Sequence, residues 1–462
     1  MLKRLFEERP GDDGLPGRER KLAMLAMITG TQLAVLDNGI VNIALPTLAD
    51  ALAISGSQSI WIANVYQLVT AALLLTFAAL SRRIGRHRLY IGGLAIFTLA
   101  SLGCALSRSF EWLLAARALQ AVGAAAMLSI GPSLYRIIFP SRLLGSAIGL
   151  SALTVAFGIA AGPSLGGLIL HVADWPWLFA INVPIGLLAL TLATRSLPRE
   201  APIRGRIDLI GALLSIVMLS GSVFALDQFG HGDGGAPAIA TLAVSLLCLI
   251  GFVWRQRHVT RPLVPLALFA EPRFSFAATV SMFAFLAQGI AFVGLPFLYQ
   301  TTLGVSPLDS ALLFTPWPLA IMLIGPLAGR LADKANPAVI SSTGLGIFLC
   351  GMLALAGIDA ETHGLDIVWR SALCGIGYGL FQAPNNREMI GSVSVELSAS
   401  ASGVLASVRT FGQSLGTASV GLILGLSFGS LTLSLWLGCV SALVALGLSL
   451  YRVPLARNPH RR

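Results

Sequence analysis

The sequence predicts an all-α polytopic membrane protein with fourteen transmembrane helices, arranged as two six-helix bundles plus two inserted central helices. Three observations support this prediction. They are an apolar composition, a regular alternation of positive charge along the chain, and an internal repeat.

The composition excludes a water-soluble protein. Of the 462 residues, 55% are hydrophobic and only 11% are charged, and the mean hydropathy is +0.81. An ordinary soluble domain carries about 25% charged residues, which it needs to cover its surface. The five cysteines have no metal-ligand or disulfide spacing, and the sequence has no phosphate-binding loop and no His-Glu-x-x-His motif. We therefore expect no metal, no cofactor and no enzymatic activity, and no step driven by nucleotide hydrolysis.

Fourteen apolar segments lie between clusters of charged residues and turns rich in glycine and proline. A helix needs about 20 residues to cross the hydrocarbon layer, and each segment is long enough or nearly so. The predicted spans are residues 22–43, 59–80, 89–107, 111–135, 144–170, 176–194, 207–228, 236–254, 275–299, 308–329, 337–358, 366–386, 398–426 and 430–451.

Positive charge alternates from loop to loop. If the N-terminus is cytoplasmic, 27 of the 31 Lys and Arg residues fall in cytoplasmic loops or tails. Cytoplasmic loops are enriched in Lys and Arg, so the pattern predicts a multi-pass membrane protein with both termini cytoplasmic. Because topology accounts for the net charge of +10, that charge does not indicate nucleic-acid binding.

An internal repeat divides the chain. GIVNIALPTL at 39–48 resembles GIAFVGLPFL at 289–298. The spacing of three glycines also recurs, at Gly149, Gly158 and Gly162 and again at Gly403, Gly412 and Gly416. Two copies in the same orientation predict two bundles around a central cavity. The predicted divisions are a tail at 1–21, a six-helix bundle at 22–195, two inserted helices with their links at 196–274, a second six-helix bundle at 275–452 and a tail at 453–462.

The span 144–170 carries a stripe of small residues. Gly158, Gly162 and Gly166 recur every fourth residue and share one helix face, where another backbone can approach closely. Pro163 lacks an N–H group and is expected to kink the helix. Two interpretations stay open: simple close packing, or a hinge between halves that rock. For Gly162 and Gly166 we expect contact with a helix of the opposite half.

Asp37 is the only acidic residue well inside a predicted span, where a charge is costly unless it faces a partner, a cavity or a proton. Arg117 lies at a similar depth in the span 111–135. A neighbouring cation favours the carboxylate and burial favours the neutral acid, so a site that moves between these environments can load and release a proton. The alternative is a fixed structural ion pair.

Other polar residues fall at comparable depth. We expect a polar strip along a substrate cavity, formed by Asn38, Asn42, Gln120 and, in the repeat, Gln288. Arg409 is either a residue that extends to the cytoplasmic surface or a second buried cation. Asp227, near the end of its span, is interpreted as a solvated helix end.

The motifs resemble those of the major facilitator superfamily, specifically its 14-helix drug:proton antiporter branch, over residues 21 to 452. The resemblance rests on LDNGIVNIALP from Leu36, RALQAVG from Arg117, WPWLFAINVPIG at 175–186 and APNN at 383–386. It rests above all on the complete glycine motif, which is Gly149, Gly158, Gly162, Pro163, Gly166 and Gly167.

The resemblance also implies cytoplasmic gating loops after the second helix of each bundle. They fall at Arg82, Gly85 and Arg86 in one copy and at Gly329 and Asp333 in the other. The first copy departs from the family pattern, because Arg82 stands where the family has Asp and Ala78 where it has Gly.

The resemblance implies a monomeric secondary transporter in the lipid bilayer of a bacterial cytoplasmic (inner) membrane. It would export lipophilic, often cationic drugs or toxic compounds in exchange for protons by alternating access, with Asp37 and Arg117 in proton coupling. Export of one endogenous metabolite or natural product by the same machinery is the nearest alternative. A transport-inactive membrane sensor is the alternative of another class.

Overall fold

The computed structural model describes most of the chain. The described residues are 7–8, 12–199, 208–230, 235–260, 262–332, 334–359, 361–394, 397–426 and 430–457. Within them, every predicted span corresponds to a helix or to two consecutive helices.

The first half is a bundle of long helices. Its elements are α2 (Gly17–Leu52), α3 (Gly56–Ile84), α4 (Arg86–Ala105), α5 (Phe110–Ile138), a short 3-10 turn η1 (Ser141–Leu143), α6 (Leu144–Val172), the short α7 (Trp177–Ala180) and α8 (Asn182–Ser196). Two inserted helices follow, α9 (Leu209–Gly230) and α10 (Gly235–His258).

The second half repeats the pattern. Its elements are the short α11 (Ala267–Ala270), α12 (Pro272–Phe297) with its π-helical extension η2 (Leu298–Thr302), α13 (Pro307–Phe314), α14 (Pro316–Ala332), α15 (Pro337–Ala356), α16 (Gly364–Gly391), α17 (Ser398–Gly425) and α18 (Leu431–Arg457). The predicted span 308–329 is thus two helices, with the break at Thr315, where Pro316 offers no N–H to continue the ladder.

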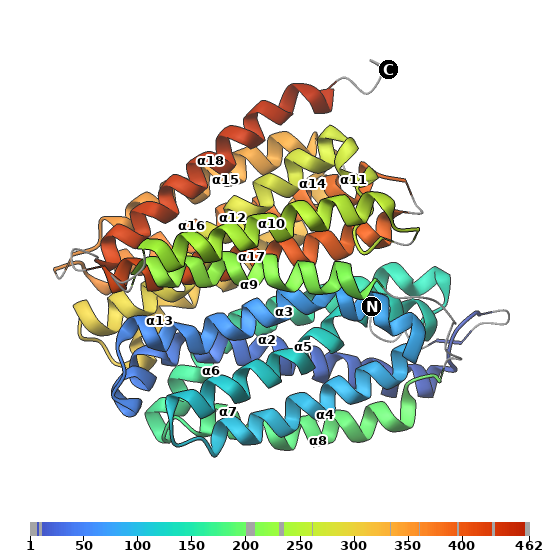
Figure 1. Cartoon of the computed structure of the whole chain (residues 1–462), viewed down its shortest axis with the longest axis horizontal. Helices are drawn as coiled ribbons and strands as arrows, with labels where there is room; N and C mark the ends of the chain where they lie inside the picture. The colour runs from blue at the N-terminus through green and yellow to red at the C-terminus, as the bar shows by residue number, and fades with distance from the viewer. Residues whose placement is uncertain are drawn as a thin grey trace.

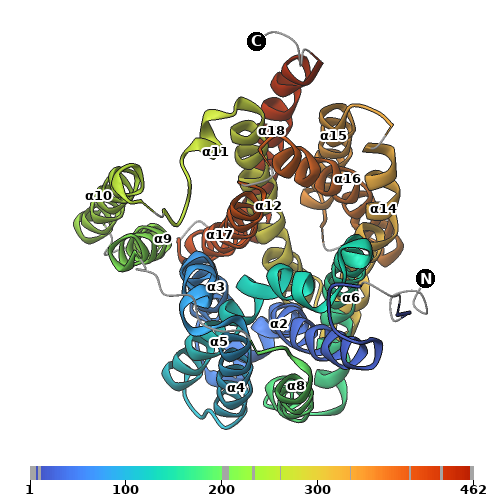
Figure 2. The ribbon, with the colours of Figure 1, turned by 90° about the vertical axis from the view of Figure 1, so that its right-hand side faces the viewer.

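The long helices lie side by side along the longest axis of the molecule (Figure 1). The start of α2 and the end of α18 lie at the same end of the bundle, which is called the terminal end below; the opposite end is the far end. Viewed along the bundle, α2 to α8 form one group and α12 to α18 another (Figure 2). The inserted α10 lies on the outside, whereas α9 packs against both α3 and α17.

Twelve helical segments in the described part of the chain are long and apolar enough to cross a membrane. The remaining two long helices, α16 and α17, contain 28 residues each but are less apolar. Both contribute polar residues to the central cavity described below, which accounts for their composition.

Each half has its own buried core. One apolar cluster joins residues of α2, α4, α5 and α8, and a second joins residues of α12, α15, α16 and α18. The internal repeat is visible in the packing. A methyl group on Gly162 of α6 would lie 3.0 Å from the Cα of Gly39 on α2, and one on Gly416 of α17 would lie 3.1 Å from the carbonyl carbon of Gly289 on α12. Gly39 and Gly289 are equivalent residues of the two copies, as are Gly162 and Gly416, so the repeated motifs make equivalent helix contacts.

Candidate substrate cavity and buried ion pair

Asp37 lies inside the first bundle as the acceptor of a fully buried polar network. Its side chain is 0% exposed, as are those of Arg117 and Gln120. Arg117 donates to Asp37 Oδ2 through Nη1, and Gln120 Nε2 donates to Oδ1 at 2.9 Å. Asn182 Nδ2, from α8, donates to the same Oδ1 at 2.8 Å. Gln120 in turn donates to Ser101 of α4 at 2.8 Å, so residues of α4, α5 and α8 bind the Asp37 carboxylate or position its donors.

Arg117 is also held from its other side. Its Nε donates to the carbonyl oxygen of Ile62 on α3 at 3.1 Å, and its guanidinium lies 4.4 Å from the ring centroid of Tyr66 and 5.7 Å from that of Phe179. Cation–π contacts of this kind are strongest where water is excluded. The sequence prediction that Asp37 and Arg117 meet is confirmed.

A cavity lies between the two halves, and the Asp37 pair borders it without lining it. Tyr66, whose ring covers Arg117, is one of the lining residues. One aromatic ring therefore separates the buried pair from the cavity. The lining residues include Asn38, Asn42, Tyr66, Gln67, Thr70, Leu128, Val155, Ile159, Phe285, Gln288, Phe292, Phe314, Ile321, Gln382, Arg409, Thr410 and Gln413.

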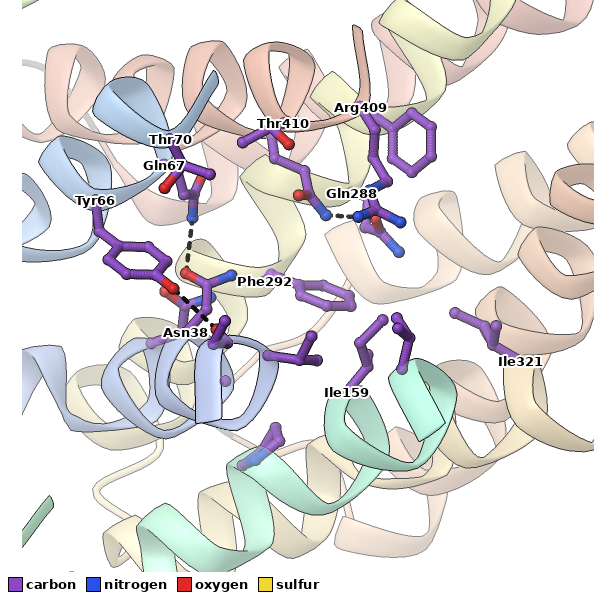
Figure 3. A pocket seen from close by; sticks show the side chains of 18 of the residues that line it. Asn38, Tyr66, Gln67, Thr70, Ile159, Gln288, Phe292, Ile321, Arg409 and Thr410 are labelled. Carbon is purple, nitrogen blue, oxygen red and sulfur yellow. Dashed lines mark hydrogen bonds between the residues drawn. The ribbon is translucent and has the colours of Figure 1, made fainter. Parts of the chain in front are cut away.

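Polar side chains from both halves face this cavity (Figure 3). Gln67 Nε2 donates to Asn38 Oδ1 at 3.4 Å, and Gln413 Nε2 donates to Gln288 Oε1 at 3.0 Å. Asn38, Asn42 and Gln288 thus lie where the sequence placed them. Gln120 does not: it is buried against Asp37 and belongs to the ion-pair network, because its position on α5 turns it toward α2 rather than toward the centre.

Contacts between the halves gather toward the far end and along the α3–α17 pair. Gln300 Nε2 donates to the carbonyl oxygen of Ile43 at 2.9 Å, and Ser164 and Thr315 share a hydrogen bond of 2.6 Å. Ser414 Oγ donates to Asn64 Oδ1 at 2.6 Å. These hydrogen bonds lie on either side of the cavity, where α3 also packs against α17 and α6 against α13.

The family of the chain follows from comparison with known proteins. A model of the Major Facilitator Superfamily matches residues 27–417. The chain belongs to this superfamily. The solved structure of the transporter PepTSo, of the POT family, aligns over 95% of this chain and 98% of its own with a TM-score of 0.71 and 15% identity, which shows a shared fold.

Similar curated proteins are transporters. The uncharacterized transporter YebQ of Escherichia coli is 40% identical over 96% of this chain and 98% of its own length. The riboflavin transporter RibZ of Clostridioides difficile is 29% identical over 87% of both chains. The multidrug resistance protein Stp of Mycobacterium tuberculosis is 30% identical over 88% of this chain and 76% of its own length. This superfamily member is therefore a multi-pass membrane transporter related to the drug-transporter branch, and not an enzyme.

The glycine motif of α6 contacts different partners from those predicted. A methyl group on Gly166 would lie 2.9 Å from the carbonyl oxygen of Ile40, so Gly166, like Gly162, faces α2 of its own half. The expected contact of these two glycines with the opposite half is wrong. Gly167 makes that contact instead. As the next residue along the helix it points in a different direction, toward α13, where a methyl group would lie 2.8 Å from Ala311 Cβ.

The predicted gating residues are described only in part. Gly85 ends α3 with a φ of 90°, a left-handed conformation that favours glycine, and Arg86 begins α4. Gly329 lies in α14 with open space around its Cα. The side chain of Arg82 and the whole of Asp333 lie outside the described residues, so the prediction of a gate at these loops stays untested.

Two further predictions concern single charges. Asp227 is not simply a solvated helix end, because Trp61 Nε1 of α3 donates to its Oδ1 at 2.6 Å. Arg409 is partly exposed and lines the central cavity.

Sequence reasoning missed a second buried charge cluster near the terminal end. Arg452, which the charge pattern assigned to the cytoplasm, is 0% exposed, because α18 continues beyond the predicted span. Its Nη1 lies 3.4 Å from Glu388 Oε2 and donates to Asn385 Oδ1 at 2.7 Å. Asn385 belongs to the APNN segment at 383–386. The proline and two asparagines of this segment, within an otherwise apolar span, were the sequence signal that could have indicated a buried polar cluster here.

Proposed function

We propose that this transporter exports small organic compounds in exchange for protons, with Asp37 as the proton-carrying group and the central cavity as the substrate site. One observation carries the proposal: the buried Asp37–Arg117 pair lies against the wall of the cavity, one aromatic ring away. Since Asp37 is 0% exposed, a proton reaches it only when the network around it opens. Opening of the helices on one side and closure on the other is the motion that alternating access requires.

Arg117 controls whether Asp37 holds a proton, because it stabilises the charged carboxylate. While Arg117 and the amide donors contact Asp37, the carboxylate is stabilised as an anion. Separation of the pair would leave a buried charge without its partner, which costs several kcal/mol unless Asp37 takes up a proton. Proton uptake and helix movement are thereby linked. We further propose a cytoplasmic membrane location with both termini cytoplasmic, on the strength of the charge alternation.

The proposal is tested with inside-out membrane vesicles that hold a proton gradient. We expect a panel of lipophilic compounds to dissipate the gradient in vesicles that contain the wild-type transporter. Asp37→Asn keeps the size and hydrogen-bonding capacity of the side chain but has no proton to exchange, so it should abolish the response. Asp174→Asn, which removes an exposed carboxylate at the far end, is the matched control and should behave as wild type.

Three results would contradict parts of this proposal. Equal proton flux in Asp37→Asn and wild type would move the coupling elsewhere and leave Asp37 as a structural ion pair. A response to one compound class alone would favour the exporter of a dedicated metabolite or natural product. The absence of flux for every compound, with intact binding, would favour the transport-inactive sensor.

A further inference from the structure

The charge of the central cavity is set by one side chain. Among the described residues that line it, Arg409 is the only charged one, and no Asp or Glu is among them. Asp37 does not lie on the wall, and its charge is matched by Arg117. The surface that a substrate meets is therefore positive.

Arg409 has no partner among the described residues. It makes no ion pair or hydrogen bond with them, and the ionisable side chain that interacts with it electrostatically is the phenol of Tyr378, which is uncharged at neutral pH. In Figure 3, Arg409 extends from α17 toward Gln288 on α12. A guanidinium has five N–H donors in a planar fork that matches the oxygens of a carboxylate or phosphate.

The rest of the wall suits an aromatic body with further polar groups. Tyr66, Phe285, Phe292 and Phe314 contribute rings from both halves. Two of the lining residues, Asn42 and Thr70, each have a buried side-chain oxygen with no hydrogen-bond partner, namely Asn42 Oδ1 and Thr70 Oγ1. Buried polar atoms normally find a partner, and a bound molecule with a donor group would supply one here.

We propose that the cavity binds aromatic organic anions, with the carboxylate, sulfonate or phosphate of the substrate paired to Arg409. The proposal departs from the cationic compounds that the family resemblance implies, since a cation would meet a like charge and no acidic partner among the described residues that line the cavity. It refines the proposed export function and rests on that function for the direction of transport only, because binding itself is measured without a gradient.

The test uses purified full-length transporter in detergent and sets of aromatic compounds that share one ring system. Each set comprises an acid (naphthalene carboxylate, sulfonate or phosphate), its uncharged amide or alcohol, and a trimethylammonium counterpart. Binding is detected by a shift of the thermal unfolding midpoint, and dissociation constants are measured by calorimetry. We expect the acids to bind most tightly, the uncharged counterparts to bind measurably but more weakly, and the cationic counterparts to be at least about tenfold weaker than the acids.

Substitutions at Arg409 separate charge recognition from fit. Arg409→Gln should weaken binding of the acids by at least about tenfold and leave the uncharged counterparts unchanged, whereas Arg409→Lys, which keeps the charge, should recover part of the loss. Arg370→Gln is the matched control, because Arg370 lies on α16 away from the cavity and donates to the carbonyl oxygen of Ala354. Unchanged binding of uncharged compounds by Arg409→Gln also shows that this variant is folded.

The outcomes are decisive for the proposal. Preferential binding of the cationic counterparts, no binding of any acid, or equal binding of acids by wild type and Arg409→Gln would each overturn it. Asp37→Asn distinguishes this proposal from the proton-coupling proposal. It should still bind the acids while it fails to export them, so loss of coupling without loss of anion binding would leave the present inference standing.

Discussion

The Asp37 carboxylate is the acceptor at the centre of the buried polar network in the first half. Its two oxygens accept hydrogen bonds from Arg117, Gln120 and Asn182, so each donor shares in the cost of keeping a carboxylate out of water. Removal of one donor leaves the charge less well compensated, and a buried group that loses a partner is destabilised by about 1 to 3 kcal/mol.

Asn182 offers a clear measure of this cost. Asn182→Leu has similar volume but no donor, and we expect it to lower the stability of the detergent-solubilised protein by about 1 to 3 kcal/mol. Asn42→Leu is the matched control, because Asn42 Oδ1 already lacks a partner and its loss should cost little. Thermal unfolding of both variants is the measurement; equal midpoints would mean that Asn182 does not contribute to the carboxylate's stability.

Asp37 and Arg117 were predictable because charges in an apolar span need a partner, and the depth of each follows from counting residues. Asn182 was not predictable in the same way. An uncharged amide in an apolar stretch is tolerated in many settings, so its partner depends on the rotation of α8 about its axis. The misplacement of Gln120 has the same cause: depth is encoded by residue number, whereas the direction of a side chain is set by tertiary packing.

At the scale of the helix, α6 shows how one stripe of glycines contacts two surfaces. Gly162 and Gly166 pack against α2 within the first half, whereas Gly167 reaches α13 of the second. The sequence predicted the close approach correctly from the spacing, but it could not identify the neighbour, because both sides of α6 carry small residues.

Two glycine substitutions in this helix compare the effect on stability of a methyl group at a tightly packed position and at an open one. Gly162→Ala would place a methyl group 3.0 Å from the Cα of Gly39, and overpacking of this kind costs about 1 to 3 kcal/mol. Gly149→Ala meets no atom within 4 Å and should be neutral or slightly stabilising, since alanine favours the helix. Unfolding midpoints in detergent check both, and equal stability of the two variants would show that the α2–α6 contact is not as close as described.

For the whole molecule, the inserted helices are arranged unequally. α9 packs against α3 of one half and α17 of the other, while α10 contacts mainly α9. If the halves move relative to each other, α9 must therefore slide against α3 or against α17. The repeat predicted that these two helices are an insertion between the paired bundles, but it gave no information on which of them touches both halves.

The orientation of the molecule in the membrane is tested by two exposed histidines at opposite ends. His363 precedes α16 at the far end, and His258 ends α10 at the terminal end. In a variant with all five native cysteines replaced, we expect His363→Cys to react with a membrane-impermeant maleimide applied outside intact cells, and His258→Cys to react only after the cells are opened. The reverse labelling pattern would invert the topology.

The positive charge that Arg409 gives to the cavity also has an electrical consequence. Exchange of one entering proton for one departing monoanion moves two positive charges inward, whereas exchange for a monocation moves none. A charge that crosses a membrane potential of 100 mV gains about 2.3 kcal/mol, so two charges gain about 4.6 kcal/mol, enough for a concentration ratio of about three powers of ten. A transporter whose substrate pairs with Arg409 would therefore be driven by voltage, and it would continue to export when the pH is equal on both sides of the membrane.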